Sequence, residues 1–124
     1  MEEPEERALA VIRSELSADR LDVLDRFIAS LRSWGAATNL VGAADLKRLW
    51  SRHVADSLQL AALAGTGPKR WIDLGAGAGF PGLVVAIARP ETAMTLVESN
   101  KKKAAFLLRA GVDCGVTVNV RSAR

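Results

Sequence analysis

Histidine and cysteine are scarce in this sequence, which contains one of each, His53 and Cys114. A lone cysteine cannot form an internal disulfide, so nothing points to an oxidising compartment, and we expect a cytoplasmic protein. One histidine and one distant cysteine are too few for a zinc site, and we expect no metal. The Gly-x-Ser-x-Gly turn of a serine hydrolase is also missing, which excludes that class of enzyme.

Long apolar runs are missing as well. The longest uncharged stretch, Leu74–Ala88, has 15 residues, whereas a membrane-spanning helix needs about 20. The chain begins with an acidic stretch, whereas a secretory signal begins with basic residues. Its 124 residues, 49% of them hydrophobic and 25% charged, have the size and composition of one globular domain. We therefore expect no membrane partner.

The charges are distributed unevenly along the chain, whose net charge is +3. Residues 1–30 contain eight acids and four bases, which gives −4, and the other six acids and thirteen bases leave +7 on residues 31–124. A basic body of this kind is compatible with a nucleic-acid partner. It is equally compatible with a soluble basic domain that binds no polyanion.

The first part of the chain, residues 1–64, predicts a helical extension. Apolar residues three and four apart predict a helix over Pro4–Leu16 and a second one that begins at the N-cap Ser17 and ends at Gly35. Asp45 is the predicted N-cap of a third helix, which is followed by a turn-rich linker. The apolar stripe of this third helix consists of Leu46, Leu49, Trp50, Val54 and Leu58.

The second part, residues 65–124, alternates apolar strand-like runs with helical ones. The predicted strands are Trp71–Leu74, Ala93–Val97 and Val116–Val120. The predicted helices are Pro81–Arg89 and a helix that is capped by Ser99 or Asn100 and ends at Gly111. This order predicts an α/β fold with a parallel sheet and right-handed crossovers. Three strands are half of a doubly wound sheet, so we expect an N-terminal fragment of a longer protein.

A glycine-rich turn, Asp73-Leu74-Gly75-Ala76-Gly77-Ala78-Gly79-Phe80-Pro81-Gly82, joins the first predicted strand to a helix. Glycines allow positive φ and close approach of a ligand, and the helix N-terminus adds N–H donors, so the turn predicts a binding site rather than a plain tight turn. Gly77-x-Gly79-x-x-Gly82 also matches the dinucleotide fingerprint. The carboxylate of Asp73 favours the cationic amino acid end of S-adenosylmethionine (SAM), since it would repel a dinucleotide phosphate.

Charged residues follow the second predicted strand. The carboxylate of Glu98 can accept two hydrogen bonds from ribose hydroxyls, which suits SAM and NAD equally. The alternative is a solvated acid at a helix start. Lys101–Lys103 oppose the dipole of the helix that they begin, which indicates phosphate contact or simply an exposed face.

The third predicted helix contains Arg52-His53-x-x-Asp56-Ser57. Arg52 and Asp56 are four residues apart and can form an ordinary surface pair. A lone histidine such as His53 is more often structural than catalytic.

Taken together, these residues resemble the bacterial small-subunit ribosomal RNA guanine-N7 methyltransferases, the RsmG or glucose-inhibited division protein B family. The match covers about residues 20–124. The motifs that carry it are Trp34…Asn39-Leu40, Arg52-His53…Asp56-Ser57, Ile72–Gly82, Thr95–Ser99 and Lys102-Lys103…Phe106-Leu107.

The resemblance implies the first half of a class I SAM-dependent, Rossmann-like methyltransferase sheet behind the helical extension. It implies SAM as cofactor and methylation of guanine N7 in the 530 loop of 16S rRNA, within the 30S subunit. By this match Gly75 and Phe80 contact SAM, Asp73, Gly77 and Gly79 shape its loop, Glu98 holds the ribose, and Arg124 precedes a dipeptide that touches adenine.

This chemistry does not need a strong base. Guanine N7 has an in-plane lone pair and no proton to lose, so methyl transfer depends on alignment of the two reactants. Arg52 and His53 are therefore candidates for orienting RNA or the base. Two alternatives stay open, an NAD-type oxidoreductase and a non-catalytic RNA-binding domain. Because half of the expected pocket is absent, we expect weak or no activity from residues 1–124 alone.

Overall fold

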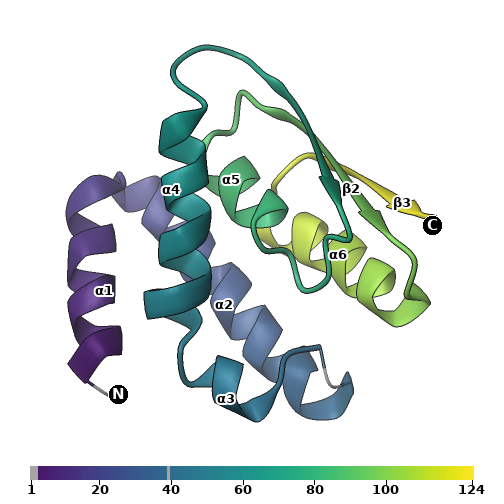
Figure 1. Ribbon diagram of the computed structural model, residues 1–124, viewed down its shortest axis with the longest axis horizontal. Helices are drawn as coiled ribbons and strands as arrows, with labels where there is room; N and C mark the ends of the chain where they lie inside the picture. The colour runs from purple at the N-terminus through teal and green to yellow at the C-terminus, as the bar shows by residue number, and fades with distance from the viewer. Residues whose placement is uncertain (1–2, 39) are drawn as a thin grey trace.

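A computed structural model describes residues 3–38 and 40–124, with side-chain surroundings for all of these except residues 36–38. Asn39, one of the residues in the resemblance, lies outside the described residues. In chain order the elements are α1 (Glu3–Glu15), α2 (Ala18–Thr38), α3 (Ala43–Leu46), the π-helix η1 (Leu49–Val54), α4 (Ala55–Leu63), β1 (Arg70–Leu74), α5 (Gly82–Ala88), β2 (Ala93–Glu98), α6 (Lys101–Cys114) and β3 (Val118–Ser122) (Figure 1).

The three strands form a parallel sheet in the order β1-β2-β3. This confirms the predicted α/β fold, in which N-terminal helices precede the first half of a Rossmann-like sheet. The helices lie on one side of the sheet (Figure 1). The other face is uncovered, since Ile72 and Leu74 of β1 are 68% and 77% exposed.

A continuous apolar core joins the helices to the sheet. Its centre is Phe27 of α2, whose ring centroid lies 5.6 Å from that of Phe80 and 6.3 Å from that of Phe106 in α6. Trp34 meets Phe106 edge-on. Because aromatic rings bury the most area per residue, these contacts hold α2 against the glycine-rich turn and α6.

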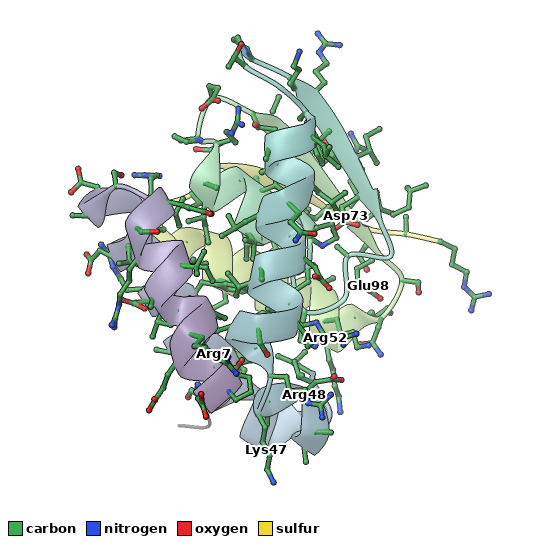
Figure 2. All side chains as sticks on the ribbon, turned by 60° about the vertical axis from the view of Figure 1, so that its left-hand side comes forward. Arg7, Lys47, Arg48, Arg52, Asp73 and Glu98 are labelled. Carbon is green, nitrogen blue, oxygen red and sulfur yellow. The ribbon has the colours of Figure 1, made fainter. Side chains whose placement is uncertain are left out.

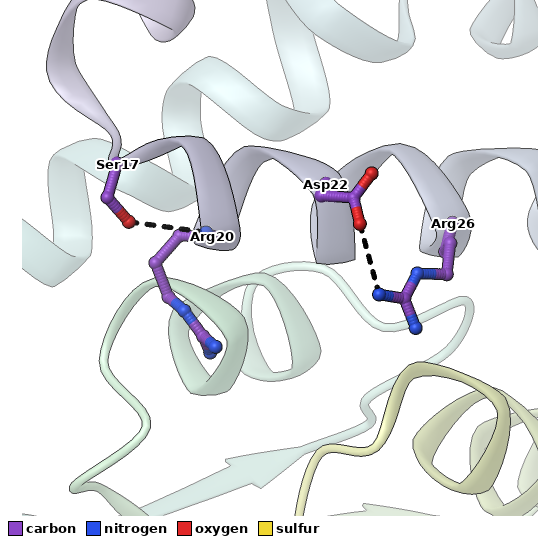
Figure 3. A network of polar contacts seen from close by, with 4 residues as sticks. All are labelled: Ser17, Arg20, Asp22 and Arg26. Carbon is purple, nitrogen blue, oxygen red and sulfur yellow. Dashed lines mark hydrogen bonds and ion pairs between the residues drawn. The ribbon is translucent and has the colours of Figure 1, made fainter.

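The predicted N-cap of α2 is confirmed. Ser17 Oγ accepts the backbone N–H of Arg20 at 3.2 Å, and Asp22 pairs with Arg26 one turn further along at 3.1 Å (Figure 3).

Two predicted helix ends at glycines are wrong. α2 continues through Gly35, which is buried and whose Cβ position would lie 3.8 Å from Leu46. α6 continues through the buried Gly111 and ends at Gly115, which has φ 66°. Both internal glycines face packed neighbours instead of turning the chain.

The third strand begins two residues later than predicted, at Val118. The N–H of Val116 bonds to the carbonyl of Gly111, and the N–H of Gly115 bonds to that of Val112. This is a Schellman motif, which uses Val116 to close the helix end before the strand can start.

The third predicted helix is divided into three pieces. Asp45 is not an N-cap, because the short α3 begins after Gly42 and contains Asp45 within it. A turn at residues 47–48 then leads into η1 and α4. The predicted apolar stripe is nevertheless the buried one, with Leu49, Trp50 and Val54 at most 4% exposed.

Candidate cofactor-binding site

The glycine-rich turn occupies the carboxyl end of β1, between this strand and α5. Gly75, Gly77 and Gly79 have φ values of 74°, 55° and 105°, which L side chains rarely adopt. The N–H groups of Gly75 and Ala76 both bond to the carbonyl of Val97 in β2, at 2.8 and 3.0 Å. The turn is therefore anchored to the neighbouring strand. The space next to Gly75 is open, since no atom of the described residues, its chain neighbours aside, lies within 4 Å of the position that a Cβ would take there.

Asp73 holds the far end of this turn. Its Oδ2 accepts the N–H of Gly82, the first residue of α5, at 2.9 Å. A Cβ on Gly82 would overlap Leu96 and lie 2.6 Å from Asp73 Oδ2, so only glycine fits there. Burial raises the pKa of Asp73, and the nearby carboxylate of Glu98 adds to this, against the lowering effect of the Gly82 N–H.

Glu98 ends β2 and closes the near end of the turn. Its Oε1 accepts the N–H of Gly77 and its Oε2 that of Asn100, both at 2.8 Å. The side chain is largely buried, which opposes ionisation, but these N–H donors and the ammonium of Lys103 outweigh burial and keep the pKa of Glu98 below its ordinary value. An ionised carboxylate has about four acceptor positions, so two remain for a ligand.

The residues at the C-terminal end of the chain reach the same edge of the sheet. Ser122 is the register partner of Glu98, and the N–H of Ala123 bonds to the carbonyl of Glu98 at 3.1 Å. Arg124 follows and is exposed. Asp73, the three glycines, Glu98 and the residue before Arg124 thus meet at the carboxyl edge, where ligands of open α/β sheets bind.

Asn100 is the N-cap of α6. Of the two caps that the sequence predicted, Ser99 and Asn100, the second is therefore correct. Its Oδ1 accepts the N–H groups of Lys102 and Lys103, at 3.0 and 3.1 Å. Lys101 and Lys102 are exposed, whereas Lys103 is half-buried and acts on Glu98.

Phe80 connects the glycine-rich turn to the helical part. Besides Phe27 it contacts His53 of η1, whose ring centroid is 5.1 Å away at an interplanar angle of 36°. A pocket of about 160 Å³ opens beside these two rings. Its lining consists of Arg52, His53, Asp56, Ser57, Leu60, Phe80 and Pro81.

The pair that the spacing of Arg52 and Asp56 allows does not form; neither residue has an ion pair within the described part of the chain. His53 Nε2 is shielded from solvent and lies 3.2 Å from Asp45 Oδ1, outside the orientation that a hydrogen bond needs. Ser57 donates its hydroxyl to the His53 carbonyl at 2.6 Å. The structure therefore brings His53 to the turn through Phe80, and no carboxylate of the described residues pairs with the Arg52 guanidinium.

Glu5 on α1 is a buried carboxylate that the sequence pattern did not single out. Its Oε1 accepts the N–H of Trp50 at 3.0 Å and its Oε2 accepts that of Ser51 at 2.6 Å. These are donors at the start of η1, so Glu5 caps the π-helix on which Arg52 and His53 lie. No local signal marks it, because it stands in an acidic run that reads as a solvated helix start.

Within residues 3–38 and 40–124, histidine, cysteine and acidic side chains form no group of three or more that could hold a metal ion. The helices of this part are too short or too polar to cross a bilayer.

Comparison with known proteins identifies the family. The profile of the GidB family, described as rRNA small subunit methyltransferase G, matches residues 20–124. Curated relatives with the name ribosomal RNA small subunit methyltransferase G include one from Rhodopseudomonas palustris, 50% identical over 108 residues that make up 85% of this chain and 45% of the relative. One from Methylobacterium sp. is 42% identical over an alignment of 125 positions, which covers 98% of this chain and 58% of the relative.

A third relative, from Bradyrhizobium diazoefficiens, is 57% identical over 90 residues, 70% of this chain and 34% of its own. The chain spans about half the length of most of the relatives it matches. With the profile match over residues 20–124, these similarities show that the chain belongs to the rRNA small subunit methyltransferase G family.

Proposed function

We propose that this chain forms the cofactor-binding part of a SAM-dependent enzyme that methylates N7 of a guanine in the 530 loop of 16S rRNA, on the 30S subunit in the cytoplasm. The observation that carries the proposal is the glycine-rich turn closed by the bond from Gly77 N–H to Glu98. Family membership supplies the class of reaction.

The residues present fit SAM. Asp73 and Glu98 place two carboxylates at the edge of the sheet, and Figure 2 shows both on the same side of the molecule. A ligand with a sulfonium and an ammonium group is attracted to such an edge, whereas the pyrophosphate of NAD is repelled. This charge supports SAM over the dinucleotide that Gly77-x-Gly79-x-x-Gly82 formally allows.

The residues of the turn and of the sheet edge have different roles in SAM binding. Glu98 uses its free acceptor positions on the ribose hydroxyls, while the open backbone at Gly75 and the ring of Phe80 contact the cofactor. Asp73, Gly77 and Gly79 hold the shape of the turn, and Arg124 lies toward the adenine. Bound SAM supplies the methyl group.

The pocket beside Phe80 is the proposed place for the target guanine. It adjoins the turn through Phe80 and Pro81, and Arg52 and His53 line it. Their task is to orient the base, since N7 attack requires alignment rather than proton removal.

The cofactor proposal is tested in a protein of the relatives' full length that contains this chain, here called the full-length protein. Glu98→Gln should weaken binding of S-adenosylhomocysteine by roughly 10- to 100-fold in calorimetry, because hydrogen bonds to a charged group contribute about 1.5–3 kcal/mol. Glu91→Gln, on the exposed loop before β2, is the matched control. Binding of NAD in place of S-adenosylhomocysteine would refute the proposal.

The reaction is tested on 30S subunits. N7-methylguanine in rRNA is cleaved by borohydride and aniline, and primer extension then locates the methylated base. RNA binding without any cofactor response or methylation would favour the non-catalytic RNA-binding alternative. We further propose that residues 1–124 alone have little or no activity. The uncovered sheet face supports this, since parallel sheets are normally covered on both faces.

A further inference from the structure

We propose that a second pocket, between the start of α1 and the α3–η1 segment, binds a phosphate of the RNA strand next to the target nucleotide. This phosphate pocket has a volume of about 290 Å³. Its lining consists of Pro4, Glu5, Lys47, Arg48, Ser51 and Arg52. The inference rests on the proposed function, because it assigns how that function's RNA is held.

The charge of the phosphate pocket fits an anion. Lys47, Arg48 and Arg52 are exposed, and none of the three has an ion pair or a side-chain hydrogen bond within residues 3–38 and 40–124. Elsewhere in this part of the chain, Arg7, Arg26 and Arg109 are paired with acids on their own helices. Three unpaired cations around one cavity repel each other until an anion enters.

The one carboxylate among the described residues that line this pocket offsets at most one of the three positive charges, and both its oxygens already have hydrogen-bond partners. Glu5 is 3% exposed, and both its oxygens accept N–H groups, from Trp50 and Ser51. Its role is to hold η1 against α1, which sets the positions of Arg48 and Arg52 at the rim. The pocket is thus built across elements that lie far apart in the sequence.

The position of the pocket matches a strand whose base enters the site already described. Arg52 lines both the phosphate pocket and the 160 Å³ pocket at His53 and Phe80. Figure 2 shows Arg48 and Arg52 on the side of the molecule where Asp73 and Glu98 lie. A guanine beside Phe80 would therefore leave its adjoining backbone over Arg52 and Arg48.

Arginine is suited to this task because its planar guanidinium donates two parallel hydrogen bonds to one phosphate. An acidic protein segment could also meet such a cluster, but it would not place a base in the adjacent pocket. RNA is the occupant that accounts for both pockets through the shared Arg52.

The test measures binding of a 16S rRNA hairpin that contains the 530 loop to the full-length protein, by fluorescence anisotropy over a series of KCl concentrations. Each phosphate contact adds about 0.7–0.9 to the slope of log affinity against log salt. The double variant Lys47→Gln/Arg48→Gln should lower that slope by about 0.7–0.9, the loss of one phosphate contact. Lys69→Gln, an exposed cation directly before β1 at the opposite end of the strands, should change it by less.

Two further readouts separate this inference from the proposed function. S-adenosylhomocysteine affinity should be unchanged in the double variant, and methylation should show a raised KM for 30S subunits with kcat retained. If the wild type binds the cofactor and methylates rRNA but the double variant keeps the full salt slope, the phosphate pocket is refuted and the proposed function stands. The phosphate pocket is also refuted if Lys69→Gln lowers the slope equally. It is refuted as well if the wild type binds an acidic peptide and the double variant loses this binding while its RNA binding is unchanged.

Discussion

The glycine-rich turn and the π-helix η1 are both held by carboxylates that accept backbone N–H groups, but these carboxylates come from different distances along the chain. Asp73 and Glu98 bond to Gly82 and Gly77 within one β-α-β unit. Glu5 reaches η1 across 45 residues from another helix. The turn is a local motif braced by its own strands, whereas the geometry of η1 depends on how α1 packs.

The largest expected effect is at the turn. Gly82→Ala should destabilise the full-length protein by about 3 kcal/mol and abolish S-adenosylhomocysteine binding, because the added methyl overlaps Leu96 and Asp73. Urea denaturation and calorimetry measure the two effects.

The control is Gly35→Ala. Gly35 is helical with its nearest neighbour 3.8 Å from the Cβ position, so alanine should be neutral or stabilise by up to about 1 kcal/mol. Equal losses from the two changes would show that close approach at Gly82 is not the cause.

The next largest effect tests η1. Glu5→Ala leaves the N–H groups of Trp50 and Ser51 without their acceptor and should cost about 2–3 kcal/mol in urea denaturation. Affinity for the rRNA hairpin should fall while affinity for S-adenosylhomocysteine stays, which distinguishes η1 from the turn. Glu6→Ala, exposed on the same helix, should do neither. Parallel loss of cofactor binding would contradict the independence of the two regions.

A smaller effect is expected at the start of α6. Asn100→Ala removes the acceptor for two N–H groups and should lower the free energy of unfolding by about 1 kcal/mol. Ser99→Ala, at the neighbouring exposed position, should change it by a few tenths at most. Similar effects of the two substitutions would place the cap elsewhere.

The smallest effect is on pH dependence. The pKa of Glu98 is lower in the folded protein than its ordinary value, so its ionised form stabilises the fold above about pH 4.3, and this contribution is lost as pH falls through the folded pKa. Asp73 has a raised pKa and acts in the opposite sense, because its protonation on acidification relieves a cost.

Urea denaturation at pH 3–7 compares the two carboxylates. Glu98→Gln should make the acid loss of stability shallower, and Asp73→Asn should make it steeper. The same change of slope in both variants would contradict the opposite pKa shifts.

Much of the turn could be predicted from the sequence because its determinants are neighbours in the chain. Glycine spacing, a carboxylate before the turn and another after the next strand are visible as a pattern, and the structure places them at one edge. The assignment of these residues to SAM stays a proposal.

The errors have a common physical cause. Glycine in a helical pattern can end the helix or pack closely inside it, and the pattern is the same in both cases. Gly111 packs closely against Val118, whereas Gly35 lies inside α2 with space for a Cβ 3.8 Å from Leu46. The division of the third helix has a similar origin, since η1 is stabilised by a carboxylate from α1.

The sequence alone determined the α/β order, the parallel sheet, the buried stripe of the third helix and the residues of the turn, because periodicity and short-range spacing encode them. Only the tertiary structure decided that α2 and α6 continue through Gly35 and Gly111, that Arg52 has no ion pair with Asp56 or any other described residue, and that Glu5 caps η1. These depend on which groups meet across the core, where an N–H removed from water is satisfied by whichever acceptor packing brings to it.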